Sequence, residues 1–275
     1  DIGLITGIAW DHVNIFPTYE EYVQQFGKFI ESIQPNGKLI YNIEDNDLVK
    51  EVAKHSVTKI SYQTFNHRIE NGVSIIQVDE KDFPLQIFGK HNLQNMAGAM
   101  QVCIQLGLTP FQFASAIQSF SGAAKRLEKI VSNNSVTVYR DFAHSPSKLT
   151  ATIKAAAEQF EGRKIIAVFE LHTYSSLSES FLNEYKNSMN EAAESIVFYN
   201  QHALQIKKLP PLNKKVVATA FNGKKLQVID NRTELEKHLH ELDYHNSVLL
   251  LMSSGNYDNM DLKTLSTYIL NQTNQ

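Results

Sequence analysis

Residues 164–169 read Lys-Ile-Ile-Ala-Val-Phe, and residues 248–252 read Val-Leu-Leu-Leu-Met. Neither run alternates apolar with polar side chains, so both faces of each strand are expected to be covered. Further apolar strands are predicted at residues 136–139 and 195–199, and segments with helical spacing separate them. This alternation predicts a doubly wound parallel α/β sheet over roughly residues 127–275.

The helices between these strands are expected at residues 147–160, 178–194 and 233–241. Ser147 is a natural N-cap for the first of them, because its hydroxyl can accept from a free backbone N–H of the first turn. The segment Gly122–Arg126 precedes this pattern and is predicted to be a hinge between two domains.

The first part of the chain also has an α/β pattern. A hairpin is expected over residues 69–79 around Asn71-Gly72, and two helices follow, one after His91 and one over residues 109–120. The other elements expected are strands at 2–9, 38–42 and 59–62 and helices at 19–33 and 46–54.

Composition limits the classes of function. The net charge of −3 argues against a nucleic-acid partner. No apolar stretch approaches the length of a membrane span, and no signal peptide is recognisable. The single cysteine, Cys103, fits a reducing compartment such as the cytoplasm. Because the chain starts inside an apolar strand without Met, we expect it to be a fragment of a longer protein.

Residues 89–95 read Gly-Lys-His-Asn-Leu-Gln-Asn. Asn92 and Asn95 are three residues apart and share a face of a helix. Each carboxamide offers a donor and an acceptor together, which suits the edge of a nucleobase. The alternative is a polar helix start with an Asn cap. The small residues 97–99 are expected to let another element pack closely against this helix.

Two further segments read Ser-Phe-Ser-Gly-Ala-Ala-Lys-Arg-Leu-Glu at 119–128 and Asp-Phe-Ala-His-Ser-Pro-Ser-Lys at 141–148. Together with residues 89–95 and the upstream Trp-Asp-His at 10–12, and in this order, they resemble the Mur ligase family. These enzymes use ATP to couple amino acids or peptides to UDP-N-acetylmuramate. The resemblance implies a partial central ATPase-type domain at 1–124 and a Rossmann-like C-terminal ligase domain at 125–275.

The resemblance also implies ATP and Mg²⁺ as cofactors, with an acyl phosphate as the intermediate. His91, Asn92 and Asn95 match the residues that contact adenine. Arg126 matches an arginine that reaches the ATP phosphates, where its guanidinium can bind two oxygens at once. The alternative for Arg126 is a surface ion pair with Glu128.

Asp141 ends a predicted strand and matches a residue that accepts from the ribose. His144 lies on a loop that faces the transferred phosphate in the family. One branch has a second histidine where this chain has Ser145. His12 matches a residue that helps to hold magnesium, although Mg²⁺ usually prefers oxygen ligands; the alternative is a turn residue with a surface histidine.

Two loops follow the ends of predicted parallel strands, where ligands bind in such sheets. Residues 170–176 read Glu-Leu-His-Thr-Tyr-Ser-Ser, and residues 252–258 read Met-Ser-Ser-Gly-Asn-Tyr-Asp. The second loop resembles that of the branch that attaches the tripeptide L-alanyl-γ-D-glutamyl-meso-diaminopimelate. The residues expected to bind the amine substrate are His172, Ser254, Gly255 and Asn256.

One departure from that branch concerns charge. The branch usually has an arginine at the position of His172, so a carboxylate-rich tripeptide would need another cation. Local basic pairs such as Lys207-Lys208 are expected to be solvated loop charges.

The predicted function is therefore an amide ligase of peptidoglycan recycling, with the tripeptide as the first choice of amine and L-alanine as the second. A folylpolyglutamate-synthase-like enzyme is a third possibility, and a non-catalytic remnant that binds nucleotide or a partner protein is the competing class. The chain contains no Gly-x-x-x-x-Gly-Lys-[Ser/Thr] loop. We expect that loop to lie before residue 1, and the fragment alone to be inactive.

Overall fold

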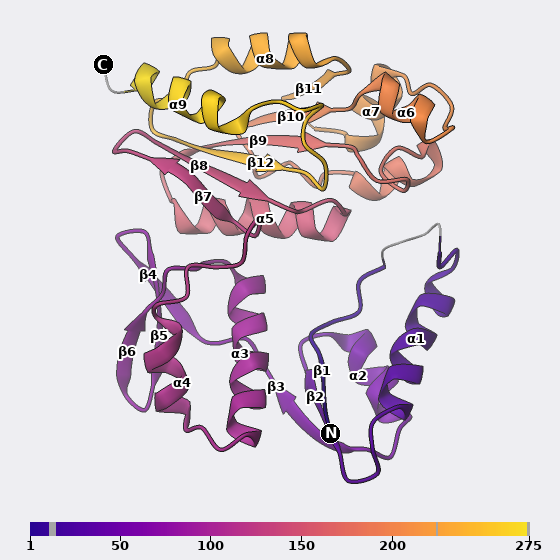
Figure 1. The fold of residues 1–275 in the computed structure, drawn as a ribbon, viewed down its shortest axis with the longest axis vertical. Helices are drawn as coiled ribbons and strands as arrows, with labels where there is room; N and C mark the ends of the chain where they lie inside the picture. Colours follow the sequence, from indigo (N-terminus) through magenta and orange to yellow (C-terminus); the bar gives the residue numbers. More distant parts are fainter. Residues whose placement is uncertain (11–14, 224, 274–275) are drawn as a thin grey trace. The chain divides into compact units, whose positions relative to one another are not determined.

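The computed structural model describes residues 1–10, 15–223 and 225–273 (Figure 1). The chain divides into two compact units, Asp1–Ser121 and Gly122–Gln275, which are called the first and second unit below. The division falls within three residues of the domain boundary proposed from the sequence.

The first unit contains a parallel sheet in the order β1-β2-β3, formed by Ile2–Ile5, Lys38–Asn42 and Thr58–Tyr62. The strand expected at 2–9 ends at Ile5, while the other two strands match their predictions closely. One face of the sheet carries a core built with α1 (Tyr19–Glu31) and α2 (Asn46–Ala53).

Helix α3 (Lys90–Gln105) packs against the sheet through a cluster of Ile40, Tyr62 and Ala97. Gly98 permits this close approach, because a Cβ there would lie 3.0 Å from the Tyr62 hydroxyl and ring. The close packing expected around residues 97–99 is therefore confirmed, and its partner is a tyrosine of the neighbouring strand.

The opposite side of α3 packs against an antiparallel sheet and α4 (Pro110–Ile117). The sheet consists of β4 (His67–Glu70), β5 (Val73–Val78) and β6 (Lys81–Pro84). Asn71 and Gly72 both have positive φ, at 50° and 74°, as a type I′ hairpin turn requires. The predicted hairpin is confirmed.

The second unit is built on a six-stranded sheet in the order β11-β10-β9-β12-β8-β7. The first five strands in this order, β11 to β8, are all parallel to their neighbours. Only the edge strand β7 is antiparallel to its neighbour, β8. The strands are β7 (Glu128–Ser132), β8 (Val136–Asp141), β9 (Lys164–Glu170), β10 (Glu194–Phe198), β11 (Leu226–Ile229) and β12 (Ser247–Met252).

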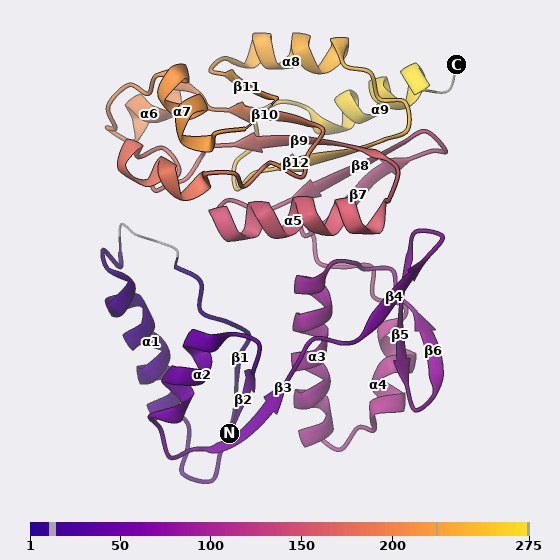
Figure 2. The same cartoon turned by 180° about the vertical axis from the view of Figure 1, so that it is seen from behind.

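Helices cover both faces of this sheet. Helix α5 (Pro146–Gln159) lies on one face, whereas α8 (Arg232–Glu241) and α9 (Leu262–Thr273) lie on the other (Figures 1 and 2). The two apolar runs that predicted the fold are neighbours, with Leu249 opposite Ile166, and both residues are fully buried. The α/β class and the doubly wound arrangement are therefore confirmed.

The prediction of a helix at residues 178–194 is wrong. Only a 3₁₀ helix forms there, Glu179–Tyr185, and turns follow it. Tertiary contacts outweigh the helical pattern: Tyr185 stacks on Phe221 with ring centroids 5.0 Å apart, and the Asn187 N–H donates to the Phe221 carbonyl. Asn187 adopts φ 61°, which interrupts a right-handed helix.

The prediction that Ser147 caps α5 is also wrong. Ser145 occupies the N-cap position, and Pro146 is the first helical residue. Proline is favoured there because the first N–H of a helix has no internal partner. Helices α6 (Gln201–Ile206) and α7 (Lys214–Phe221) were not predicted from the sequence.

Candidate functional site

Three predicted site loops of the second unit leave the same edge of its sheet. Strands β8, β9 and β12 end at Asp141, Glu170 and Met252, and β12 lies between the other two. Met252 is opposite Asp141 on one side and Phe169 on the other. The loops therefore gather where parallel α/β sheets bind ligands.

Asp141 anchors the start of the second unit. Its buried carboxylate accepts from the Leu127 N–H at 2.8 Å, the Ala143 N–H at 2.8 Å and the Thr152 hydroxyl at 3.1 Å. A carboxylate has about four acceptor positions, so these bonds leave little capacity for a further donor. The carboxylate fixes the backbone next to Arg126, and its predicted contact with ribose stays a prediction.

The two residues predicted to be catalytic, Arg126 and His144, both contact the ring of Phe142. The Arg126 guanidinium carbon lies 5.4 Å from the ring centroid, and the His144 ring meets Phe142 edge-on at 5.2 Å. Glu128 accepts from the Lys125 N–H at 2.8 Å. Arg126 is therefore an exposed cation held on an aromatic face.

Several contacts orient His144. Its Nδ1 lies 2.8 Å from the Phe142 carbonyl oxygen, which can only accept, so Nδ1 carries the proton. Lys148 Nζ lies 3.4 Å from His144 Nε2, and the Tyr185 hydroxyl donates to the His144 carbonyl at 2.7 Å. Lys148 thus lies beside one oriented imidazole, and Arg126 shares the Phe142 ring with it, in a region predicted to meet phosphate.

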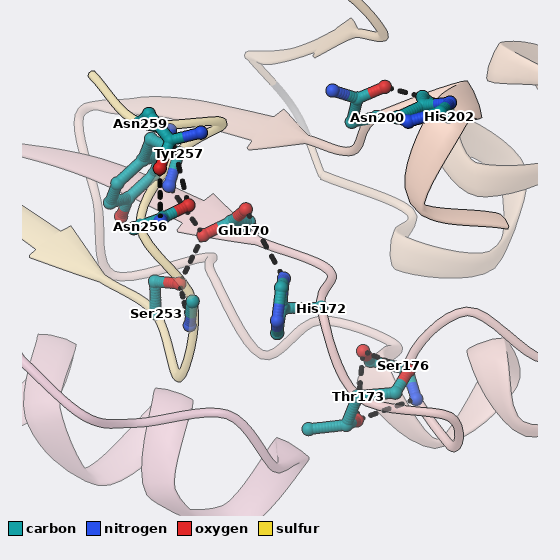
Figure 3. A network of polar contacts seen from close by, with 11 residues as sticks. Glu170, His172, Thr173, Ser176, Asn200, His202, Ser253, Asn256, Tyr257 and Asn259 are labelled. Atoms are coloured by element: carbon teal, nitrogen blue, oxygen red, sulfur yellow. Dashed lines mark hydrogen bonds and ion pairs between the residues drawn. The ribbon is translucent and has the colours of Figure 1, made fainter. Parts of the chain in front are cut away.

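A second network joins the loops after β9 and β12 (Figure 3). One oxygen of the buried Glu170 accepts from the Ser253 hydroxyl and from the Tyr257 N–H, the latter at 2.9 Å. The other oxygen lies 3.5 Å from His172 Nδ1. Since Glu170 ends β9 and Ser253 follows β12, this carboxylate fixes the two loops relative to each other.

Gly255 packs closely against His172 and Glu170. A Cβ there would lie 2.5 Å from His172 Nδ1 and 2.8 Å from a Glu170 carboxylate oxygen. The Gly255 N–H donates to the Ser253 hydroxyl at 2.6 Å. Only a glycine lets the loop after β12 pass this close to His172, so two of the predicted substrate residues lie together.

The other two predicted substrate residues have different surroundings. Asn256 exchanges hydrogen bonds with Asn259, donating to its side chain at 2.8 Å and accepting from its N–H at 3.1 Å. Ser254 Oγ is buried and has no hydrogen-bond partner among the residues that the structure describes. Asn256 therefore shapes the turn, and substrate contacts of both residues remain predictions.

Tyr257 anchors the far end of this turn. Its hydroxyl donates to the Val168 carbonyl at 3.0 Å, and burial raises the pKa of Tyr257, so the phenol stays neutral. Tyr257, Asp258 and Asn259 all have positive φ between 52° and 62°. Three successive non-glycine residues in this region are strained, and the bonds to Glu170 and Val168 hold them in place.

The predicted adenine site belongs to the first unit. Asn92 donates from its side chain to the Phe88 carbonyl at 2.9 Å, Asn95 is exposed, and His91 is partly exposed. The N-cap of α3 is Gly89, without a side-chain cap bond, so the alternative of an Asn cap is wrong. The exposed Asn95 carboxamide is compatible with binding a base, and that role stays a prediction.

An ion pair at the start of α3 was not predicted. Lys90 Nζ lies 3.0 Å from a Glu44 carboxylate oxygen, and Glu44 also accepts from the Thr64 N–H at 2.8 Å. The Thr64 hydroxyl also donates to Glu44 and is the largest cause that lowers the pKa of this carboxylate; the Thr64 N–H and Lys90 lower it further. Glu44 thereby connects the segment after β2 to the first turn of the helix that carries His91.

The predicted magnesium ligand, His12, lies outside the described residues. Within residues 1–10, 15–223 and 225–273, no group of three or more His, Cys, Asp or Glu side chains is placed to hold a metal ion. In the same ranges, no helix is long and apolar enough to cross a membrane.

Three residues that hold the candidate site together were not singled out in the sequence: Glu170, Lys148 and Glu44. Glu170 had a signal, because a carboxylate closing an apolar run must find partners when it is buried. Lys148 lies in the motif at 141–148 but four residues beyond His144. Glu44 had no local signal, since its partner Lys90 is far away in the sequence.

Comparison with protein families gives two successive matches. Residues 1–103 match the Mur ligase middle domain, and residues 125–255 match the Mur ligase glutamate ligase domain. A UDP-N-acetylmuramate--L-alanine ligase of Brachyspira hyodysenteriae is 24% identical over 93% of this chain, and the chain covers 58% of that protein. The corresponding ligase of Caldicellulosiruptor saccharolyticus is 31% identical over 71% of the chain, which covers 46% of it.

Solved structures share the fold. A murein peptide ligase from Psychrobacter arcticus has a TM-score of 0.63 at 18% identity, covering 98% of this chain and 57% of that one. A MurF ligase of Thermotoga maritima, solved in complex with ADP, has a TM-score of 0.68 at 18% identity, covering 98% and 60%. The chain thus spans about half to three-fifths of these relatives.

The two domain matches follow each other along the chain, and one lies within each unit. They also include the motifs at 10–12, 89–95 and 141–148, and the last four residues of the motif at 119–128. The chain belongs to the Mur ligase family and contains its middle domain followed by its glutamate ligase domain.

Proposed function

We propose that this chain is part of an ATP-dependent ligase that joins the carboxylate of UDP-N-acetylmuramate to the amine of L-alanyl-γ-D-glutamyl-meso-diaminopimelate. The observation that carries the proposal is the assembly of Glu170, His172, Ser253 and Gly255 at one edge of the second unit. That edge is the usual ligand side of a parallel sheet. The loop of residues 253–256 is also the one that resembles the tripeptide-adding branch.

The chemistry requires charge neutralisation and alignment. ATP, when bound, supplies the phosphoryl group that activates the carboxylate. Arg126 is suited to bind phosphate oxygens through two N–H groups at once. Its position on the Phe142 ring limits the motion of the guanidinium, so less ordering is needed when phosphate binds.

His144 and Lys148 would act beside Arg126. With Nδ1 bonded to the Phe142 carbonyl, the imidazole directs Nε2 towards Lys148. The ammonium can donate to phosphate and to the imidazole together, because it has three N–H groups. Asp141 holds the adjoining backbone at Leu127 and Ala143 and thereby orders this loop.

In the first unit, we propose that His91 and Asn95 contact adenine, with Asn92 fixed by the Phe88 carbonyl. For magnesium, His12 is the proposed ligand. A ligase that consumes ATP and a UDP-sugar would work in the cytoplasm, where both substrates are made.

A second candidate is the addition of L-alanine to the same UDP-sugar. It is favoured by the names of the curated relatives, since the two reported above are both UDP-N-acetylmuramate--L-alanine ligases. Against it stands the loop at 253–256, whose sequence resembles the tripeptide-adding branch.

The choice of amine is tested in a ligase that contains this chain and turns over. The value of kcat/KM is measured with the tripeptide and with L-alanine, each at saturating ATP and UDP-N-acetylmuramate. The proposal predicts that kcat/KM is at least about a hundredfold higher for the tripeptide than for L-alanine. The reason is that a site with polar groups for the tripeptide leaves those groups unpaired when the smaller amine binds. A preference for L-alanine would select the second candidate.

A further inference from the structure

The loop after β9 has little positive charge of its own. Its only basic side chain, His172, lies 3.5 Å from the buried carboxylate of Glu170. A carboxylate-rich amine that approached this loop would meet the negative field of Glu170 as well as the imidazole. Recognition of a distal carboxylate therefore needs a cation from another element.

Tyr174 projects from this same loop. The Thr173 hydroxyl bonds to Ser176 Oγ at 3.0 Å and accepts from the Ser176 N–H at 3.0 Å, which closes a tight turn (Figure 3). Ser175 and Ser176 are buried, whereas Tyr174 at the tip is 47% exposed. The turn thus presents an aromatic ring to solvent two residues after His172.

Lys207 lies over this ring. Its ammonium nitrogen is 4.6 Å from the Tyr174 ring centroid, and the residue is half-buried. Its backbone is fixed at the end of α6, where the Lys207 N–H donates to the Ala203 carbonyl at 3.1 Å. Leu204, one turn before it, is buried and anchors the helix. The expectation that Lys207 is a solvated loop charge is therefore wrong.

Two other cations of the second unit, Lys214 and Arg232, are neutralised within the protein. Lys214 pairs with Asp230 at 2.9 Å and with Glu234, and Arg232 pairs with Glu236 at 2.8 Å. For Lys207, the described part of the chain supplies no carboxylate within ion-pair distance. It is a positioned cation whose charge is not cancelled.

We propose that Lys207, held on Tyr174, is the cation that binds a distal carboxylate of the peptide substrate, in place of the arginine missing at His172. The inference rests on the proposed tripeptide ligase. The aromatic face attracts the ammonium without forming a hydrogen bond, so its N–H groups stay able to donate to a carboxylate. L-Alanine has no distal carboxylate and would not use this contact.

The test measures binding of the tripeptide L-alanyl-γ-D-glutamyl-meso-diaminopimelate and of L-alanine to the whole chain by NMR titration. Lys207→Met should raise the Kd for the tripeptide roughly tenfold, the usual scale for one charge-assisted hydrogen bond. Lys208→Met is the matched control, because it removes the same charge from the exposed neighbouring residue, and its Kd should equal that of the wild type. Tyr174→Phe keeps the ring and should also bind normally.

Each outcome decides a separate point. If Lys207→Met binds the tripeptide as the wild type does, or if Lys208→Met loses as much affinity, the assignment of Lys207 is overturned while the proposed function stands. Equal loss of L-alanine affinity in Lys207→Met would also overturn it, since the contact would not be with a distal carboxylate. If the wild type binds neither amine, the proposed function fails, and the inference fails with it. Unchanged melting temperatures confirm that the variants are folded.

Discussion

Replacing Arg126 with alanine in a ligase that contains this chain should lower kcat by roughly a hundredfold to a thousandfold, the usual cost of removing one group that stabilises charge in the transition state. The guanidinium is exposed, lies on the Phe142 ring and has no carboxylate neighbour that the structure records. Its loss should therefore affect catalysis far more than stability. Steady-state kinetics and a denaturation curve measure the two effects separately.

Two variants make this result specific. Arg126→Lys keeps the charge but cannot bind two phosphate oxygens in a fork, so it should recover only part of the rate. Arg68→Ala removes another exposed arginine, one that pairs with Asp82 and Glu70 on the antiparallel sheet of the first unit. It should leave kcat unchanged. An Arg126→Ala enzyme with the wild-type rate would remove this residue from the site.

Gly255→Ala should disrupt the loop after β12. The added methyl would lie 2.5 Å from His172 Nδ1 and 2.8 Å from Glu170, which is too close for any side-chain contact. His172 is 38% exposed and can move, but Glu170 is only 4% exposed and holds both Ser253 and Tyr257. Either movement breaks the network, at a cost of roughly 1–3 kcal/mol of unfolding free energy.

Urea denaturation measures this loss, and the NMR signals of the His172 ring report its displacement. Ser254→Ala is the neighbouring control for stability, since the Ser254 hydroxyl makes no hydrogen bond within the described residues. It should not lower the unfolding free energy, because a buried hydroxyl without a partner contributes a desolvation cost and no bond. Wild-type stability and an unmoved His172 in Gly255→Ala would show that the loop is not held as described.

The central strands of the second unit could be predicted from the sequence, because burial on both faces alone determines their pattern of side chains. The runs at 164–169 and 248–252 formed paired central strands, because strands apolar on both faces fit only a covered sheet. Prediction from the sequence failed where distant contacts compete with local preference. The helix expected at 178–194 is absent because Tyr185 and Asn187 make contacts with Phe221 that a straight helix could not.

The candidate site follows the same pattern. The predicted strand ends showed which loops carry Asp141, His172 and Gly255. They also predicted that these loops lie together, because the carboxyl ends of parallel strands share one edge of the sheet. The partners of those residues could not be predicted, since they come from distant segments. Lys207 is the clearest case: only the fold places α6 against the turn that carries Tyr174.

The central claim is that this chain serves an amide ligase that works through an acyl phosphate. It is tested most directly with UDP-N-acetylmuramate labelled with ¹⁸O in both carboxylate oxygens. When the carboxylate attacks the γ-phosphorus, ADP leaves and one labelled oxygen bridges carbon to phosphorus. Attack by the amine then breaks the carbon–oxygen bond. Mass spectrometry should find one ¹⁸O in each inorganic phosphate released with the amide; unlabelled phosphate, or label in AMP, would contradict the account.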